Sequence, residues 1–268
     1  MIDILQRAAR EAGEILKKYY KKGIQTSNKT SFKDLVTKAD YESQQKIYDV
    51  ILGDLTKKQF KKEDIGFVGE ENLNINGTHK FIIDPLDGTN NFASGFDYFC
   101  VSIGYMKNNQ VIAGVIYNPL KDTLYFAQKT KGAYKIQNNI EQRLIMHYRK
   151  LSKMLCATIY HSVKNVYEKE VKITDKIYPH IRGIRINHSA ALDLALCSDE
   201  VFGLSLAGLS SIWDIAAGSL IIEESKGAFV DWSGKKIRLD PETPFQYYPY
   251  IACHPKLLPE VLPFFKNQ

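Results

Sequence analysis

Cysteine and histidine are sparse in this chain, and neither forms a recognisable metal-binding pattern. The 268 residues include only four cysteines (Cys100, Cys156, Cys197 and Cys253) and six histidines. No C-x-x-C pair and no H-x-H or H-x-x-x-H spacing occurs, which argues against a zinc site and against a redox-active cysteine pair. Widely separated, unpaired cysteines are typical of buried free thiols in a reducing compartment.

Long apolar runs and dense basic blocks are also missing. No apolar run reaches the roughly 18 residues that a membrane span needs, and Asp3, Arg7 and Arg10 place charges where a signal peptide is apolar. The net charge is +6 and the pI is about 8.9, but the excess is spread in short lysine pairs. Such a distribution is typical of a solvated surface and argues against nucleic acid as the main partner. We therefore expect a soluble, cytoplasmic protein without membrane contact.

The first half of the chain predicts two helices followed by a strand-rich section. Apolar residues three or four positions apart predict helices over 2–21 and 38–55, with a polar loop over 22–33 between them. Strands are expected at 65–68, 80–84, 99–106, 110–117 and 123–128. Asn108–Asn109 is typical of a hairpin turn between two of these strands.

The second half alternates strands and helices. Strands are expected at 157–160, 184–187, 201–206, 227–230 and 249–253, and helices at 163–177, 189–197, 213–225 and 255–266. This order predicts the α/β class with mixed sheets. We expect one domain over 1–268, with possible halves 1–140 and 150–268. The polar, basic segment 135–153 is interpreted as a poorly constrained connection between them.

Two carboxylates stand close together on a turn that follows an apolar strand. Asp84 and Asp87 are three residues apart, and Gly88-Thr89 follows at once. A tight turn of this kind directs side chains and a backbone carbonyl at one point, which suits a hard cation such as Mg²⁺. Gly88 lets backbone N–H groups come close to an anion. The turn therefore predicts a metal ion together with a phosphate group.

Two further acids occupy similar junctions between an ordered element and a loop. Glu70 follows the strand predicted over 65–68, and Asp214 stands at the start of a helix rich in small residues. Four carboxylates at one site would repel each other unless two or three divalent ions bound between them. Such ions offset the charge of a phosphomonoester and lower the pKa of a bound water. For Asp214 alone, capping of the helix is an equally good interpretation.

These segments resemble the signatures of the inositol monophosphatase family. The matching segments are Gly69–Glu71, Asp84–Phe92 and Trp213–Gly218, with Asp34–Asp40 and Gly132–Tyr134 in addition. They occur in the family's order and span nearly the whole chain. The resemblance implies a layered α-β-α-β-α sandwich of the sugar phosphatase type. It also implies a homodimer and Mg²⁺-dependent hydrolysis of a small phosphorylated metabolite, with two or three ions at each site.

The resemblance also implies roles for single residues. Its metal ligands would be Glu70, Asp84, the Leu86 carbonyl, Asp87 and Asp214. Thr89 and Asp40 would orient the attacking water, Glu70 would help to position a third ion, and the Gly88 and Thr89 amides would bind phosphate. Contacts with the rest of the substrate would come from Asp87, His188, Ser189, Ala190 and Asp214. Lys29 lies where the family often places a basic residue.

The identity of the substrate stays open at this point. Family members that act on inositol phosphates commonly carry an acid at the position of Ala207, and a methyl group cannot accept a hydroxyl hydrogen bond. Fructose-1,6-bisphosphate, 3′-phosphoadenosine 5′-phosphate, NADP and histidinol phosphate are the alternatives. For His188, a structural role and a substrate contact are equally good interpretations. A second hypothesis is an RNA- or RNA-polymerase-associated regulatory protein on the same fold, and a third is a metal-stabilised structural protein.

Overall fold

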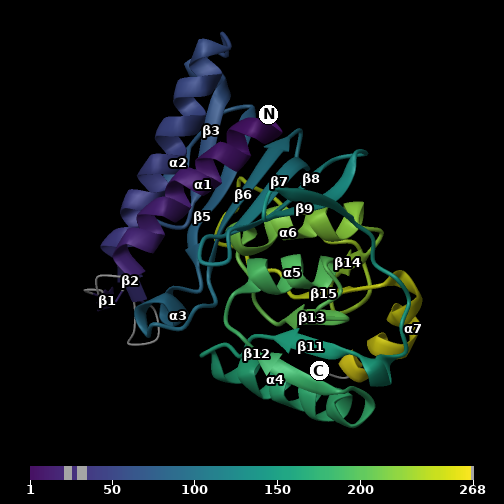
Figure 1. Ribbon diagram of the computed structural model, residues 1–268. Helices are drawn as coiled ribbons and strands as arrows, with labels where there is room; N and C mark the ends of the chain where they lie inside the picture. Colours follow the sequence, from purple (N-terminus) through teal and green to yellow (C-terminus); the bar gives the residue numbers. More distant parts are fainter. Residues whose placement is uncertain (21–25, 29–34, 267–268) are drawn as a thin grey trace.

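The computed structural model describes residues 1–20, 26–28 and 35–266, and it consists of five alternating layers of helices and strands (Figure 1). Helices α1 (Ile2–Tyr20) and α2 (Lys38–Lys57) cover the outer face of the first sheet. Helices α5 (Ala190–Ser198) and α6 (Ile212–Glu224) form the layer between the sheets. Helices α4 (Lys164–Ile177) and α7 (Leu258–Val261) cover the second sheet. The predicted α-β-α-β-α sandwich is confirmed.

The first sheet has eight strands in the order β10-β9-β8-β7-β6-β5-β3-β4. All neighbours are antiparallel except β3 and β5, which run parallel. The bounds are β3 (Ile65–Gly69), β4 (Leu73–Ile75), β5 (His79–Asp87), β6 (Cys100–Lys107), β7 (Gln110–Asn118), β8 (Thr123–Gln128), β9 (Gly132–Gln137) and β10 (Ile140–Leu144). A short helix, α3 (Thr89–Ala93), follows β5. Because β3 and β5 are parallel neighbours, the residues that follow them meet at one edge of the sheet.

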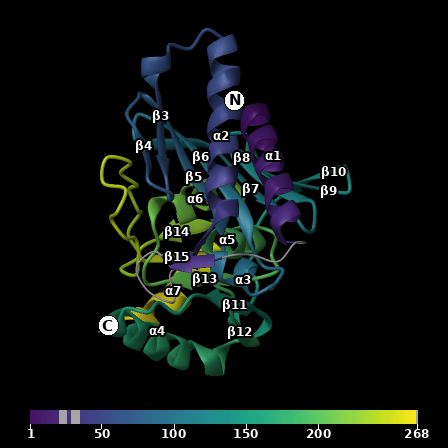
Figure 2. The same cartoon turned by 90° about the vertical axis from the view of Figure 1, so that its left-hand side faces the viewer.

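The second sheet has five strands in the order β12-β11-β13-β15-β14. Its parallel strands are β11 (Leu155–Thr158), β12 (Gly183–Ile186) and β13 (Leu204–Ala207). The antiparallel pair β14 (Ala228–Val230) and β15 (Tyr250–Cys253) completes it. A separate antiparallel pair joins β1 (Thr26–Asn28) to β2 (Leu35–Thr37). Figure 2 shows the same layers from the side.

The interpretation of 135–153 as a poorly constrained connection was wrong over 135–144. Strands β9 and β10 form a hairpin there, and its turn residues Asn138 and Asn139 have φ of 52° and 61°. Asparagine tolerates this left-handed region, and two such residues make a type I′ turn. The hairpin lacks an apolar alternation because β10 is an exposed edge strand up to Leu144. The turn predicted at Asn108 and Asn109 has the same geometry, with φ of 50° and 54°.

Two other predicted elements differ from the structure. The strand expected over 201–206 begins only at Leu204, and Val201 is exposed. The final helix expected over 255–266 is broken into 3₁₀ turns on either side of α7. Pro259 and Pro263 explain the interruption because proline has no N–H to donate within a helix. Among the described residues, no helix combines the length and the apolar character needed to cross a bilayer.

Helix α6 packs very closely against the first sheet. A Cβ atom at Gly104 would lie 2.9 Å from Ala216 Cβ, and one at Gly114 would lie 2.8 Å from Ala217 Cα. Glycines on β6 and β7 therefore face the small residues of the helix, which explains why the sequence of α6 is rich in alanine and glycine. This contact fixes the height of the helix, and with it Asp214, above the sheet.

Gly114→Ala is expected to destabilise the protein by about 1–3 kcal/mol, because the added methyl group overpacks the interface between β7 and α6. Gly53→Ala is the matched control. Gly53 is exposed inside α2 with no neighbouring atom within 4 Å, so the same change should stabilise the helix by about 0.5–1 kcal/mol. Urea unfolding of both variants measures the difference. Equal changes in the free energy of unfolding would show that the close contact between β7 and α6 does not exclude a side chain at position 114.

Candidate active site

The turn after β5 has a fixed backbone. The Leu86 N–H donates to Asp84 Oδ1 at 3.0 Å, and the Thr89 hydroxyl donates to the Leu86 carbonyl at 3.0 Å. Gly88 has φ of 95°, and a Cβ there would lie 2.8 Å from the Tyr98 carbonyl oxygen. Only glycine fits this position without strain. Asp84, Asp87 and Thr89 are thus held at the same edge of the sheet at which Glu70 follows β3.

One face of α2 supports this turn with polar side chains. Thr89 Oγ1 also lies 3.3 Å from Asp40 Oδ1, and the Ser43 hydroxyl donates to the Pro85 carbonyl at 2.9 Å. The Gln44 side chain pairs with the backbone of Glu71 at 2.9 and 3.1 Å. The sequence predicted Asp40 but missed Ser43 and Gln44. Their signal was present, because the three buried residues continue the apolar face of α2 at spacings of three and four.

Asp87 is held from the second half of the chain. Its Oδ2 accepts a hydrogen bond from the Ser189 hydroxyl at 2.6 Å and another from the Ala191 N–H at 2.7 Å. Both donors lie at the start of α5, where the helix dipole favours a negative charge. Ser189 and Ala190 are buried, and Ser189 binds Asp87, whereas His188 is exposed beside them.

Asp214 lies in the first turn of α6. Its Oδ2 accepts a hydrogen bond from the Ser211 N–H at 2.7 Å, so the capping interpretation holds, with Asp214 as the third residue of the helix. The Ser102 hydroxyl donates to the Trp213 carbonyl at 3.2 Å, and Ser102 is paired with Asp84 between β5 and β6. Asp214 and Asp84 lie within hydrogen-bonding reach of each other.

The acids form one buried region of negative charge. Burial raises the pKa of Asp84 well above its usual range, and the neighbouring Glu70, Asp87 and Asp214 raise it further. The pKa of Asp214 is raised in the same way by burial, by Asp87 and by Glu70. Burial raises the pKa of Asp87 to about 6, although its hydrogen bonds with Ser189 and Ala191 oppose the shift. The four carboxylates predicted as metal ligands, Glu70, Asp84, Asp87 and Asp214, therefore interact electrostatically with one another.

The candidate ligands are carboxylate and carbonyl oxygens, the atoms that hard divalent cations such as Mg²⁺ prefer. Within the described residues, the three aspartates form no ion pair with lysine or arginine, and no three acidic, histidine or cysteine side chains are already grouped as the ligands of one ion. The uncompensated carboxylates favour a cation site, whereas the lack of a preformed ligand group does not. The charge carries more weight. Side-chain rotation brings oxygens together at small cost, whereas a buried, uncompensated carboxylate costs several kcal/mol.

The model of the inositol monophosphatase family matches residues 1–263. The chain belongs to this family. Its members are phosphomonoesterases and are generally metal-dependent. The family assignment predicted from the motifs is confirmed.

The chain is similar to several known proteins over most of its length. An inositol-1-monophosphatase of Mesorhizobium japonicum is 32% identical over 247 residues, which cover 90% of this chain and 88% of that protein. A fructose-1,6-bisphosphatase/inositol-1-monophosphatase of Thermotoga maritima is 32% identical over 236 residues, covering 88% and 86%. A Nus factor SuhB of Xylella fastidiosa is 31% identical over 254 residues, covering 91% and 86%. The crystal structure of the extragenic suppressor protein suhB from Bartonella henselae matches with a TM-score of 0.86 and 29% identity over 99% of this chain and 98% of that one.

A buried acid behind the site was missed by the sequence analysis of this family member. Asp193 Oδ1 accepts hydrogen bonds from the Tyr98 hydroxyl at 2.5 Å and from the Asn187 amide at 2.8 Å. Asn91 links the same segments by donating to the carbonyls of Tyr98 and Asn187, both at 2.7 Å. The other oxygen of Asp193 has no partner among the described residues, and burial raises the pKa of Asp193 to about 8. A lone aspartate inside an apolar helix was the only sequence signal.

Asp193→Asn is expected to flatten the pH dependence of stability. The folded pKa of about 8 lies above the unfolded value of about 4, so the stability that the protonated acid contributes is complete below pH 4 and is lost as the pH rises through 8. Asparagine keeps the acceptor for Tyr98 and Asn187 without ionising. Urea unfolding in chelator between pH 5 and 9 tests this. Parallel curves for both proteins would contradict the assignment.

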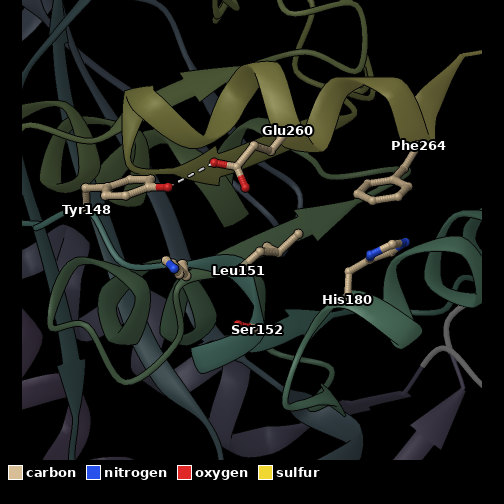
Figure 3. A pocket seen from close by; sticks show the side chains of 7 residues that line it. Tyr148, Leu151, Ser152, His180, Glu260 and Phe264 are labelled. Atoms are coloured by element: carbon tan, nitrogen blue, oxygen red, sulfur yellow. Dashed lines mark hydrogen bonds between the residues drawn. The ribbon is translucent and has the colours of Figure 1, made fainter.

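A separate cavity of about 480 Å³ lies beside α7 (Figure 3). The Tyr148 hydroxyl points at Glu260 and donates to it at 3.1 Å, and His180 stands beside Phe264. The cavity is lined by Tyr148, Lys150, Leu151, Ser152, His180, Glu260 and Phe264. It contains a single carboxylate and none of the coupled acids, so we do not assign the phosphatase chemistry to it.

Proposed function

We propose that the protein hydrolyses a small phosphomonoester in a Mg²⁺-dependent reaction at the turn of Asp84–Thr89. The observation that carries this proposal is the coupled set of buried carboxylates beside a glycine turn. Elements from both halves of the chain bring these acids together, although their mutual repulsion opposes folding. Membership of a phosphomonoesterase family gives that arrangement its chemistry.

The residues that would hold two or three Mg²⁺ ions are Glu70, Asp84, Asp87, Asp214 and the carbonyl of Leu86. When bound, such ions neutralise phosphate charge and lower the pKa of water. The protein's own contribution is to hold the ligands. Ser189 and Ala191 donate to Oδ2 of Asp87, and Ser211 donates to Oδ2 of Asp214, so these hydrogen bonds fix the orientation of both carboxylates.

Other residues would orient the water and the phosphate. The Thr89 hydroxyl lies within hydrogen-bonding distance of both Asp40 and the Leu86 carbonyl. We propose that Thr89 accepts a proton from the attacking water while its own proton passes to buried Asp40. The backbone N–H groups of Gly88 and Thr89 would bind phosphate oxygens, because the left-handed conformation of Gly88 turns the chain into the start of α3.

The candidate substrates divide by the group attached to the phosphate. The names of the relatives point to inositol monophosphate and fructose-1,6-bisphosphate. Ala207 is fully buried and apolar, which does not favour a polyol contact at that position. The other candidate substrates are 3′-phosphoadenosine 5′-phosphate, NADP and histidinol phosphate.

The direct test measures phosphate release from these five compounds by the purified protein with Mg²⁺. We expect release from at least one compound, with kcat/KM differing widely among them. Thr89→Ala should lose this activity, whereas Thr243→Ala, in an exposed loop, should keep it. Absence of release from every compound at saturating Mg²⁺ would overturn the proposal.

A second candidate function rests on the similarity to a Nus factor SuhB and on the basic pI of about 8.9. It is a regulatory role in association with RNA or RNA polymerase, and it is compatible with catalysis. Salt-dependent binding of RNA by a protein that lacks phosphatase activity would favour this role over hydrolysis. We also propose that the protein is cytoplasmic and forms a homodimer, and light scattering of the purified protein tests the dimer.

A further inference from the structure

One side chain of α3 ties the acidic turn to the second half of the chain. The Asn91 amide nitrogen donates to the carbonyls of Tyr98 and Asn187, both at 2.7 Å. An amide NH₂ group has two hydrogens, so these bonds use the whole donor capacity of Asn91. Asn91 therefore joins three segments, which are the short helix after Asp87, the chain before β6 and the chain between β12 and α5.

An acid of α5 joins two of these segments a second time. Asp193 Oδ1 accepts from the Tyr98 hydroxyl at 2.5 Å and from the Asn187 amide at 2.8 Å. Asp193 is fully buried, where a hydrogen bond is stronger than it is in water. Tyr98 and Asn187 are thus each held twice, at the backbone carbonyl by Asn91 and at the side chain by Asp193. We call Asn91, Tyr98, Asn187 and Asp193 the clamp.

One end of the clamp lies against the turn that would bind phosphate. The Tyr98 carbonyl that accepts from Asn91 is the group that a Cβ at Gly88 would approach to 2.8 Å. Asn91 therefore fixes the piece of backbone against which Gly88 packs. The N–H of Gly88 is one of the two amides proposed to bind the phosphate.

The other end of the clamp lies against Asp87. Asn187 is two residues before Ser189, whose hydroxyl donates to Asp87 Oδ2 at 2.6 Å. The Ala191 N–H donates to the same oxygen at 2.7 Å, and the Asp193 N–H donates to the Ser189 carbonyl at 3.0 Å. The clamp residues and the donors of Asp87 therefore alternate along one short segment, and a shift of this segment moves those donors.

The donors matter because Asp87 is repelled by its neighbours. Glu70 acts on the charge of Asp87, and fixed donors oppose rotation of the Asp87 carboxylate away from that charge. Partners of this kind, one step behind the ligands, orient the ligands and set the affinity of metal sites. Asn91 and Asp193 are not among the ligands proposed for Mg²⁺, so any effect they have on the ion passes through other residues.

We propose that the clamp positions Asp87 and Gly88 together, and that it thereby sets the affinity of the site for Mg²⁺. Asn91 and Asp193 are positioning residues, because they act on the ion through Asp87 and on the phosphate through Gly88. A single structure, built from both halves of the chain, would then align a metal ligand with a phosphate-binding amide. This inference rests on the proposed phosphatase function.

The test is a calorimetric titration of the purified protein with MgCl₂ alone, without substrate. Asn91→Leu keeps the size of the side chain and removes both donors, and Asp193→Ala removes the shared acceptor. Each change should raise the Kd for Mg²⁺ by about 10- to 100-fold, the range typical of partners behind metal ligands. Asp193→Asn loses the same carboxyl group but keeps the acceptor for Tyr98 and Asn187, so its Kd should stay close to that of the unaltered protein.

Turnover separates positioning from damage to the fold. With the substrate that gives the fastest phosphate release, kcat of Asn91→Leu and Asp193→Ala should be low at limiting Mg²⁺ and should largely recover in excess Mg²⁺. Thermal unfolding in chelator checks that both variants fold. If they do not, Tyr98→Phe carries the test, because it removes only one hydroxyl from the clamp and should raise the Kd by a smaller factor.

Asn165→Leu and Asp175→Ala are the matched controls, because both residues are exposed on α4. They should change neither the Kd nor kcat. Clamp variants that unfold at a lower Tm but bind Mg²⁺ with the unaltered Kd would overturn the proposal and leave the clamp a structural role. Absence of phosphate release by the unaltered protein would instead refute the phosphatase function, and the Kd values would still decide the role of the clamp.

Discussion

Asp84→Asn is expected to lower kcat by about a hundredfold or more, beyond the loss that changes in outer-shell residues cause. Asp84 lies at the centre of the acidic region, where Glu70, Asp87 and Asp214 all act on its charge. We expect the fold to survive, since burial already disfavours the charged form and asparagine keeps the acceptor for the Leu86 N–H. Phosphate release and thermal unfolding, each with and without Mg²⁺, measure the two effects.

Asp175→Asn is the matched control, because Asp175 is an exposed aspartate on α4, far from the acidic turn in the sequence. It should retain full activity. Turnover of the Asp84 variant close to that of the unaltered protein would remove Asp84 from the ligand set. Loss of the folded state in chelator would instead assign it a structural role.

Removal of divalent ions by a chelator is expected to abolish phosphate release, and added Mg²⁺ should restore it. Mg²⁺ should also raise the Tm, because it offsets repulsion among buried carboxylates. The rise should be larger at pH 8 than at pH 5. Binding requires the deprotonated acid, and the pKa of Asp87 is raised to about 6, so the competing proton is lost as the pH rises through that value.

The Asp84→Asn variant serves as the control for the ion experiment as well, since its Tm should respond less to Mg²⁺. Activity that persists in excess chelator would exclude the metal mechanism. A Tm increase that is equal at both pH values would show that Mg²⁺ binds elsewhere on the protein.

The sequence predicted those parts of the fold and site that local patterns encode. The turn from Asp84 to Thr89 combines a strand, two acids and a glycine within a few residues, and most helices and strands follow a clear apolar period. The β9–β10 hairpin was missed because an exposed edge strand has no apolar alternation. Residues 255–266 were predicted as one helix because their apolar spacing is helical, although Pro259 and Pro263 interrupt the helix.

Local sequence patterns did not predict the contacts between distant segments. Spacing on α2 indicates that Ser43 and Gln44 are buried, but their partners, like those of Asp193, are far away in the sequence and no spacing rule identifies them. Glu170 looked like one more charged residue on a lysine-rich helix. It is fully buried and accepts from the Gly208 N–H, a contact that only the absence of a side chain at Gly208 allows.

The close packing of α6 on the first sheet has a consequence for assembly of the protein. Asp84 and Asp87 come from a strand made early in synthesis, whereas Asp214 arrives on a helix from the second half of the chain. Under the proposed ligand set, an ion shared between them is a cross-link between two layers, comparable to a disulfide but reversible. Full ion affinity would then appear only when the last layer docks, so ion binding would report on completed folding.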